Sequence, residues 1–304
     1  MVYSNVRRRV SATSRFPPVH AEMSSTPKRN SPSTTITVIR PTSDKVHFDL
    51  FELWRFRHLV LAFALRDVKL RYRQTLLGVA WVVLQPLVGA VIFAMFTRVA
   101  KVPTGELPPL LFSFSSLLGW TVFQSVLTKS GNCLLGNSQM VSKIYFPRLV
   151  LPVSVVPGVM IDLGVSLAVL AGLMAWYRVP PGAALAMAPV FLLGLVVLAL
   201  AAGMVFSALS VSFRDIQYIV PVMVQFLFWA SPVVLPAHLY SADLQWLMIA
   251  NPVAGLIEGL RWSVLGTQAP STASLIVGLA GAVFAFMAAS VFFLRLERRF
   301  ADVI

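Results

Sequence analysis

Charged residues are scarce in this sequence. Asp, Glu, Lys and Arg make up 12% of the 304 residues, whereas 57% of the residues are hydrophobic. Soluble domains carry roughly 25% charged residues, so this chain has about half the usual share. So few charges cannot cover the surface of a water-soluble protein of this length. The composition therefore indicates a chain whose main solvent is a lipid bilayer.

The common signatures of catalysis and metal binding are also missing. The sequence has no G-x-x-x-x-G-K-[ST] phosphate loop, no H-E-x-x-H or G-x-S-x-G motif, and no cluster of paired carboxylates. Its one cysteine, Cys133, excludes an intrachain disulfide and a thiolate metal cluster. On the side that we assign to the exterior below, the acids Asp243 and Glu258 stand isolated in the sequence. We therefore predict a protein that is not an enzyme, with no catalytic residue, metal or cofactor of its own.

Long apolar runs are what the sequence has instead. A helix needs about 20 apolar residues to cross a bilayer core about 30 Å thick. Four runs without Asp, Glu, Lys or Arg are long enough: 76–97, 107–128, 183–212 and 273–294. Two more are 149–177, which contains Asp162, and 216–237, which Pro221 and Pro232 interrupt. We therefore predict an all-α integral membrane protein with six transmembrane helices.

Basic residues lie at alternate ends of these runs. On one side, which we assign to the cytoplasm, they are Arg55, Arg57, Arg66, Lys69, Arg71, Arg73, Lys129, Lys143, Arg148, Arg214, Arg295, Arg298 and Arg299. On the other side they are only Arg98, Lys101, Arg178 and Arg261. Because cytoplasmic loops are enriched in Lys and Arg, we expect both termini in the cytoplasm. The net charge of +13 then needs no nucleic acid partner.

Residues 1–45 form a basic tail rich in Ser, Thr, Pro and Arg. Such a composition buries too little apolar surface to offset chain entropy, so we expect disorder there and a transmembrane domain over 46–304. The tail has no apolar segment of the length found in signal peptides. Whether translation starts at Met1 or Met23 is left open.

Residues 50–73 have the pattern of an amphipathic, basic helix. One stripe is apolar and contains Leu50, Trp54, Leu61, Leu65, Val68 and Tyr72. Another is charged and contains Glu52, Arg55, Arg66, Lys69 and Arg73. A helix of this kind lies along a membrane surface. We therefore predict an interfacial helix that precedes the first crossing.

The inner loop 136–152 is longer than a plain turn requires. It places aromatic and cationic side chains close together, namely Lys143, Tyr145, Phe146 and Arg148. Pro147 should end any helix at the residue before it. Exposed aromatic residues beside cations are typical of a protein–protein contact.

Several residues inside the predicted bundle have two interpretations. Asp162 is either a structural hydrogen-bonding group or part of a proton relay, and we favour the first because a relay usually needs several such groups. Four aromatic residues are candidates for lining a transport path, with core packing as the alternative: Trp81, Trp120, Phe123 and Phe226. The small residues Ala199, Ala201, Ala202 and Gly203 permit close helix contact.

The outer segment 236–270 is neither fully apolar nor strongly polar. Its pieces LQWLMIA and VAGLIEGLRWSVLG predict two short helices that dip into the outer leaflet.

Four blocks of the sequence resemble one known family, the permeases of polysaccharide-exporting type-2 ABC transporters. The blocks are RDVKLRYRQTLLGVAWVVLQPL (66–87), SKIYFPRLVLP (142–152), FRDIQYIVPVMVQFLFWASPVVLP (213–236) and NPVAGLIEGLRWSVLG (251–266). They occur in the family's order and on the expected sides of the membrane. The resemblance runs from about residue 50 to the end of the chain.

The resemblance implies a bacterial inner-membrane protein with six crossings, an interfacial helix and short outer re-entrant helices. It implies that two permeases pair and that each docks a separate ATP-binding subunit, which would hold the ATP and Mg. The family's coupling segment falls on Lys143, Tyr145, Phe146, Pro147 and Arg148, and its interfacial helix on Arg66, Asp67, Lys69, Arg71, Tyr72 and Arg73.

The resemblance also implies a lipid-linked polysaccharide cargo, with O-antigen as our first choice. Capsular polysaccharide, teichoic acid, and a lipid or drug are the alternatives within transport. A membrane glycosyl- or phospho-transferase is the alternative from another class, and it would need a cluster of acids at one membrane face, which the sequence does not show.

Overall fold

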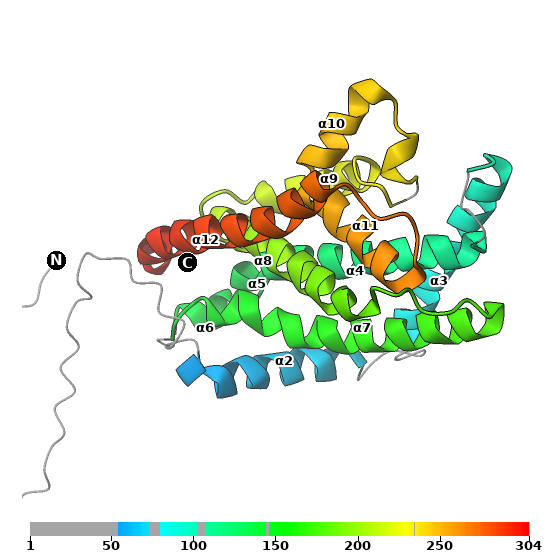
Figure 1. The fold of residues 1–304 in the computed structure, drawn as a ribbon. Helices are drawn as coiled ribbons and strands as arrows, with labels where there is room; N and C mark the ends of the chain where they lie inside the picture. Colours follow the sequence, from blue (N-terminus) through cyan, green and yellow to red (C-terminus); the bar gives the residue numbers. More distant parts are fainter. Residues whose placement is uncertain (1–53, 73–79, 103–106, 144–145, 234, 304) are drawn as a thin grey trace, which may run out of the picture. The chain divides into compact units, whose positions relative to one another are not determined.

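The computed structural model describes residues 54–303 apart from 73–79, 103–106, 144–145 and 234. Every regular element within this part of the chain is helical (Figure 1). In chain order the elements are α2 (Arg57–Tyr72), α3 (Ala80–Val99), α4 (Pro109–Gly131), α5 (Cys133–Gly136), α6 (Ser138–Val141), α7 (Val150–Tyr177), η1 (Leu185–Met187), α8 (Ala188–Ser212), α9 (Ile216–Trp229), η2 (Ala237–Leu239), α10 (Ala242–Ala250), α11 (Pro252–Leu265) and α12 (Thr272–Val303). The predicted tail, 1–45, lies outside the described residues.

Five of the described helices are long and apolar enough to cross a membrane. They are α3, α4, α7, η1 together with α8, and α12 over Thr272–Glu297. These helices coincide with five of the six predicted runs. The remaining run, 216–237, contains the shorter apolar helix α9. The prediction of an all-α membrane protein is therefore confirmed.

Helix α9 is shorter than the run that predicted it because of a proline. It has 14 residues, which at 1.5 Å per residue gives a length of about 21 Å. Pro221 lies inside the helix and does not end it. Pro232 disfavours the helical conformation at Ser231, and α9 ends just before, at Trp229. The chain continues to Pro236 without regular structure in its described residues.

Helix α4 lies at the centre of the bundle, where it contacts α3, α7, α8 and α11 (Figure 1). Its side chains are buried almost without interruption from Leu111 to Phe123. In contrast, α3, α7 and α12 keep large apolar side chains exposed, for example Ile92, Ile161 and Phe284. Exposed apolar faces of this kind suit helices that contact lipid.

Close packing of α4 against α8 depends on small residues, as predicted. Ala199 and Ala201 are fully buried, and Gly203 faces Ser130 of α4. A Cβ atom at Gly203 would collide with the Ser130 hydroxyl and lie 3.1 Å from the carbonyl oxygen of Leu127. Because lipid gives apolar helices no hydrophobic drive to associate, such contacts hold the bundle together.

Helix α2 runs beside α7 (Figure 1). The face that meets the bundle carries Phe63 and Ala64, which are buried, and Val68, which lies beside Gly158 of α7. Leu61 and Leu65 of the predicted apolar stripe are more than half exposed and point away from the protein. Leu61 and Leu65 are available to lipid, whereas Val68 of the same predicted stripe meets the bundle, an attachment that the sequence pattern did not predict.

The two short helices predicted for the side that we assign to the exterior, called the outer side below, are present as α10 and α11. They meet at Asn251, whose side chain caps α11 by accepting a hydrogen bond of 3.0 Å from the backbone N–H of Val253. Pro252 occupies the first helical position, where it loses no intrahelical hydrogen bond. Gly266 ends α11 with a φ of 67°, a conformation that glycine adopts without strain. Helix α11 is mostly buried, whereas α10 is mostly exposed.

The contact between α4 and α8 yields a stability prediction. We expect Gly203→Ala to destabilise the protein by about 1–3 kcal/mol, because the added methyl group forces Ser130 and the two backbones apart. The matched control is Gly164→Ala in α7, where an added Cβ meets nothing within 4 Å. Thermal unfolding in detergent measures both variants, and equal midpoints would contradict the close contact.

Candidate functional site

The segment between α4 and α7, which we assign to the cytoplasmic side and call the inner segment, begins with two short helical turns. They are α5 and α6, and they meet at Asn137, whose side-chain amide donates a hydrogen bond of 2.8 Å to the carbonyl oxygen of Cys133. Ser142 and Lys143 form a turn after α6, and Phe146 and Pro147 are not helical. The helical turns of this segment therefore lie upstream of the described residues of the predicted coupling segment, Lys143 and Phe146 to Arg148.

Phe146 is buried in the chain's own inner core. Only 7% of its surface is exposed, and its ring packs against Phe63 of α2 at a centroid distance of 5.9 Å. A ring in this position cannot reach a partner protein directly. In the single chain Phe146 therefore fills the inner core, and its expected part in coupling to an ATP-binding subunit stays a prediction.

Arg148 ties the inner segment to the last helix. Its backbone N–H donates to Glu297 Oε1 at 3.0 Å, and its Nη1 donates to the backbone carbonyl of Glu297 at 2.7 Å. These contacts join the start of α7 to α12 over a sequence separation of 149 residues. Lys143, by contrast, is exposed at the surface. Tyr145 lies outside the described residues.

Arg66 links α2 to the same inner segment. Its Nη2 donates to Asn137 Oδ1 at 2.8 Å and pairs with Asp67 Oδ1 at 2.9 Å. Its guanidinium also lies over the ring of Phe63. Of the other predicted interfacial residues, Lys69 is exposed, and Arg73 and the side chains of Arg71 and Tyr72 are outside the described part.

A polar cavity of about 330 Å³ lies between α2, α5 and α7. Arg66, Asp67 and Lys129 are in its wall. Each of these two cations has an acidic partner. Arg66 pairs with Asp67, and Lys129 Nζ lies 3.5 Å from Asp162 Oδ2 on α7. Asp162 thus has an ion-pair partner at the end of α4, which favours the structural interpretation of this residue over a proton relay.

The four aromatic candidates for a transport path divide into two pairs. Trp120 and Phe123 are almost fully buried, and Trp120 donates from Nε1 to Gln124 Oε1 at 2.9 Å and packs edge-on against Phe228. These two residues belong to the core of the subunit. Trp81 on α3 and Phe226 on α9 are more than half exposed, so they remain candidates for a path outside the single subunit.

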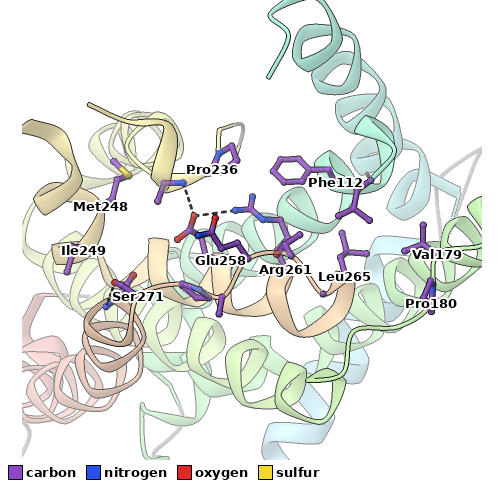
Figure 2. Close-up of a pocket in the computed structure, with 18 of the residues that line it drawn as sticks. Phe112, Val179, Pro180, Pro236, Met248, Ile249, Glu258, Arg261, Leu265 and Ser271 are labelled. Carbon is purple, nitrogen blue, oxygen red and sulfur yellow. Dashed lines mark hydrogen bonds and ion pairs between the residues drawn. The ribbon is translucent and has the colours of Figure 1, made fainter. Parts of the chain in front are cut away.

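On the outer side, a buried arginine occupies the centre of a polar cluster (Figure 2). Arg261 of α11 is only 4% exposed, and its guanidinium lies over the ring of Phe112 at 4.4 Å. Its Nη2 is 3.3 Å from Glu258 Oε1, and its Nη1 donates to Ser116 Oγ of α4 at 3.1 Å. A buried charge needs such partners, because desolvation without them is costly.

The same helix face holds the irregular segment that follows α9. Asn251 donates from Nδ2 to the carbonyl of Ala230 at 3.0 Å, and Arg261 Nη1 lies 3.4 Å from the carbonyl of Pro232. Glu258 Oε1 accepts a hydrogen bond of 2.7 Å from the backbone N–H of Ala237. Asn251, which caps α11, and two side chains of α11 therefore supply partners for backbone groups that no helix satisfies.

An outer cavity of about 1130 Å³ adjoins this cluster. Its wall is built from the ends of α4 and α7, from α10 and α11, and from the loop before α12. Arg261, Glu258, Gln245 and Gln268 are among its polar lining residues. In Figure 2, Glu258 and Arg261 lie between Met248 on one side and Phe112 on the other.

Sequence reasoning missed this outer cluster. It treated Glu258 as an isolated acid, which was wrong, and it counted Arg261 among four outer basic residues without assigning it a partner. A signal was present, since residues three apart on a helix face the same side, and opposite charges at that spacing pair. The contacts with Ser116 and Pro232 span 145 and 29 residues and leave no local signature.

The five long apolar helices and the helical fold define a multi-pass membrane protein. Comparison with known families assigns the class further. The family described as ABC-2 type transporter matches residues 58–265, and the chain belongs to this family.

Three relatives share the name "O-antigen export system permease protein RfbA". The protein from Myxococcus xanthus is 28% identical over 256 residues, which cover 83% of this chain and 98% of the relative. Two proteins from Klebsiella pneumoniae are 27% and 25% identical, and each match covers 81% of this chain and 95% of the relative. The similarity thus extends over nearly the whole length of each relative.

The outer cluster yields a second prediction. Arg261→Met should destabilise the protein by about 3–5 kcal/mol, because it leaves the Glu258 carboxylate buried without its cation. Arg178→Met, at an exposed arginine, is the matched control and should have little effect. Unfolding in detergent measures both.

Combining Arg261→Met with Glu258→Gln tests the pairing itself. The amide oxygen can still accept from Ala237, and it carries no charge, so the double variant should lose less stability than the sum of the single variants. Strict additivity would show that the two charges do not interact.

Proposed function

We propose that this chain is the membrane-spanning subunit of an ATP-driven exporter that moves a lipid-linked polysaccharide across the bacterial cytoplasmic membrane. The observation that carries the proposal is the match to three O-antigen export permeases over at least 95% of their length. O-antigen is therefore favoured over capsular polysaccharide, teichoic acid, lipid or drug as the cargo. Membership of a transporter family also favours transport over the transferase alternative.

ATP hydrolysis belongs, in this proposal, to a separate subunit. The sequence has no phosphate loop to hold a nucleotide, so ATP and Mg would bind to a partner of the ATP-binding cassette type. The ABC-2 family membership supports such a partner. The energy reaches the cargo only if ATP binding changes the relative stability of two conformations of this chain.

The inner segment is the part that we propose to dock the ATP-binding subunit. The turn of α6 and the following residues are exposed at Gln139, Ser142 and Lys143. Phe146 and Arg148 anchor this surface to α2 and α12. Lys143 and Tyr145 would contact the partner, Pro147 would set the angle at which α7 starts, and Phe146 and Arg148 would position the segment.

A path for the cargo would form between two copies of this chain. Trp81 on α3 and Phe226 on α9 are the exposed aromatic residues among the four candidates. Aromatic faces suit a sugar polymer, because they pack against the C–H groups of sugar rings without fixing a particular position. Both termini would lie in the cytoplasm, as the distribution of basic residues favours.

The proposal predicts the phenotype of a strain that lacks this chain. Polymer should accumulate on its lipid carrier at the inner face of the membrane, and surface polysaccharide should disappear until the gene is restored. The purified chain alone should hydrolyse no ATP, whereas the complex with its ATP-binding subunit should. Normal surface polysaccharide in the deletion strain would refute the proposed cargo.

The inner segment gives a prediction that separates docking from folding. Tyr145→Ala should weaken docking by about 2 kcal/mol or more, so that less ATP-binding subunit co-purifies with a normally folded permease. Phe146→Ala should instead reduce the amount of folded permease, because the loss of a buried ring costs about 3–5 kcal/mol.

The matched control for Tyr145→Ala is Trp246→Ala. Trp246 is an exposed aromatic residue on α10, on the opposite side of the membrane in our assignment. Its replacement should leave co-purification unchanged. If Tyr145→Ala also retains the ATP-binding subunit at full coupled activity, the aromatic ring has no role in docking.

A further inference from the structure

The outer cavity beside Arg261 is large enough to bind more than an ion. Its volume of about 1130 Å³ lies above the range of roughly 300–1,000 Å³ that is usual for small-molecule sites. The docking and transport roles proposed above do not involve it. We therefore asked which chemistry its wall would accept.

The wall has polar groups on several sides. Arg178 follows α7, Gln245 lies on α10, and Gln268 and Ser271 belong to the loop before α12. Amides and hydroxyls both donate and accept hydrogen bonds. A site for acyl chains would need a mostly apolar wall, whereas this one suits a ligand rich in hydroxyl groups.

Flat apolar surfaces lie between these polar groups. Tyr177, Pro180 and Pro270 are in the wall, and the rings of Tyr177 and Pro180 are accessible. Sugar rings have both kinds of surface, since their hydroxyl groups form hydrogen bonds while their C–H faces pack on aromatic and proline rings. The lining therefore matches carbohydrate on both counts.

Arg261 contributes a cation to the wall. Its Nε–H has no hydrogen-bond partner among the described residues, but this atom is closed to solvent, so a ligand in the cavity would not reach it. Arg178 and Arg261 outnumber Glu258 in the wall, and this balance admits a neutral or mildly acidic sugar.

We propose that the outer cavity is a carbohydrate-binding site that holds a few sugar residues on the exterior side of the membrane. The sugar would form hydrogen bonds with Gln245, Gln268 and Arg178 and pack against Tyr177 and the neighbouring prolines. The inference rests on the proposed function only for the origin of the sugar, which would be the exported polymer.

Protection of a single cysteine from labelling tests the site. Cys133 is the only cysteine and is buried, so Cys133→Ala gives a background in which Gln268→Cys is the one reactive thiol. The full complex with its ATP-binding subunit is placed in phosphatidylethanolamine nanodiscs and labelled with a water-soluble maleimide. Maltotetraose, mannotetraose and chitotetraose are added separately as probes.

We expect at least one of the three sugars to slow the labelling of Gln268→Cys, by about tenfold when it stands at about ten times its dissociation constant. Asp243→Cys, at an exposed position on α10 that does not line the cavity, is the control and should label at an unchanged rate. Adding Gln245→Leu to the Gln268→Cys chain should restore fast labelling in the presence of the sugar.

Two results would overturn the site. One is labelling of Gln268→Cys that none of the three sugars slows. The other is slow labelling without sugar in phosphatidylglycerol nanodiscs, which would identify a lipid headgroup as the occupant. Export of polysaccharide by the same complex is measured in parallel. Export without protection refutes the sugar site alone, whereas protection without export refutes the proposed function alone.

Discussion

Backbone polar groups inside a membrane bundle must find partners within the protein, and the segment after α9 meets this constraint through α11. Pro232 and Pro236 keep this segment from continuing the helix, which leaves carbonyl and N–H groups without intrahelical partners. Asn251, Glu258 and Arg261 supply hydrogen bonds to Ala230, Pro232 and Ala237. Without these side chains the apolar run 216–237 could not end its helix at Trp229 and still pack against the bundle, because its free backbone groups would lack partners.

This arrangement explains why α11 is buried although it is too short to span a membrane. Asn251, Glu258 and Arg261 lie seven and three positions apart, which places them on one side of the helix. Its other side carries Leu256, Ile257 and Leu260, which pack into the main core. One face of α11 forms hydrogen bonds with backbone groups and another packs into the core, so the helix has little freedom to move by itself. The outer end of α9 is therefore fixed, while most of the surface of α9 stays exposed.

The sequence predicted what depends on the local length of apolar runs, and it missed what depends on contacts between distant residues. Apolar runs identified five long helices and the two short outer ones, because the bilayer sets the length of a crossing. The pattern of α2 was harder to interpret. Leu61 and Leu65 form an apolar stripe that faces outward, while Phe63 and Ala64 meet the bundle. In a membrane protein both faces can be apolar, so periodicity alone does not show which one is buried.

The same limit applies to the candidate site residues. Trp120 and Trp81 are equivalent in sequence terms, yet one is buried beside Phe228 and the other is exposed on α3. Phe146 combines an aromatic ring with neighbouring cations, the pattern of an interface, but its ring fills the inner core. Only the fold decides between these roles, because each depends on an element that is far away in the sequence.

Helix α4 connects the two polar regions of the subunit physically. Its 23 residues give a rod about 35 Å long, comparable to the thickness of the membrane. At its inner end, α5 and α6 follow almost directly, and Asn137 between them bonds to Arg66. At its outer end, Phe112 and Ser116 contact Arg261. A displacement of the inner segment along this rod would therefore reach the outer cluster through one continuous helix, with no flexible connection between them. A transporter must couple conformational changes on the two sides of a membrane. Helix α4 is the element that contacts both polar regions and can transmit such a change.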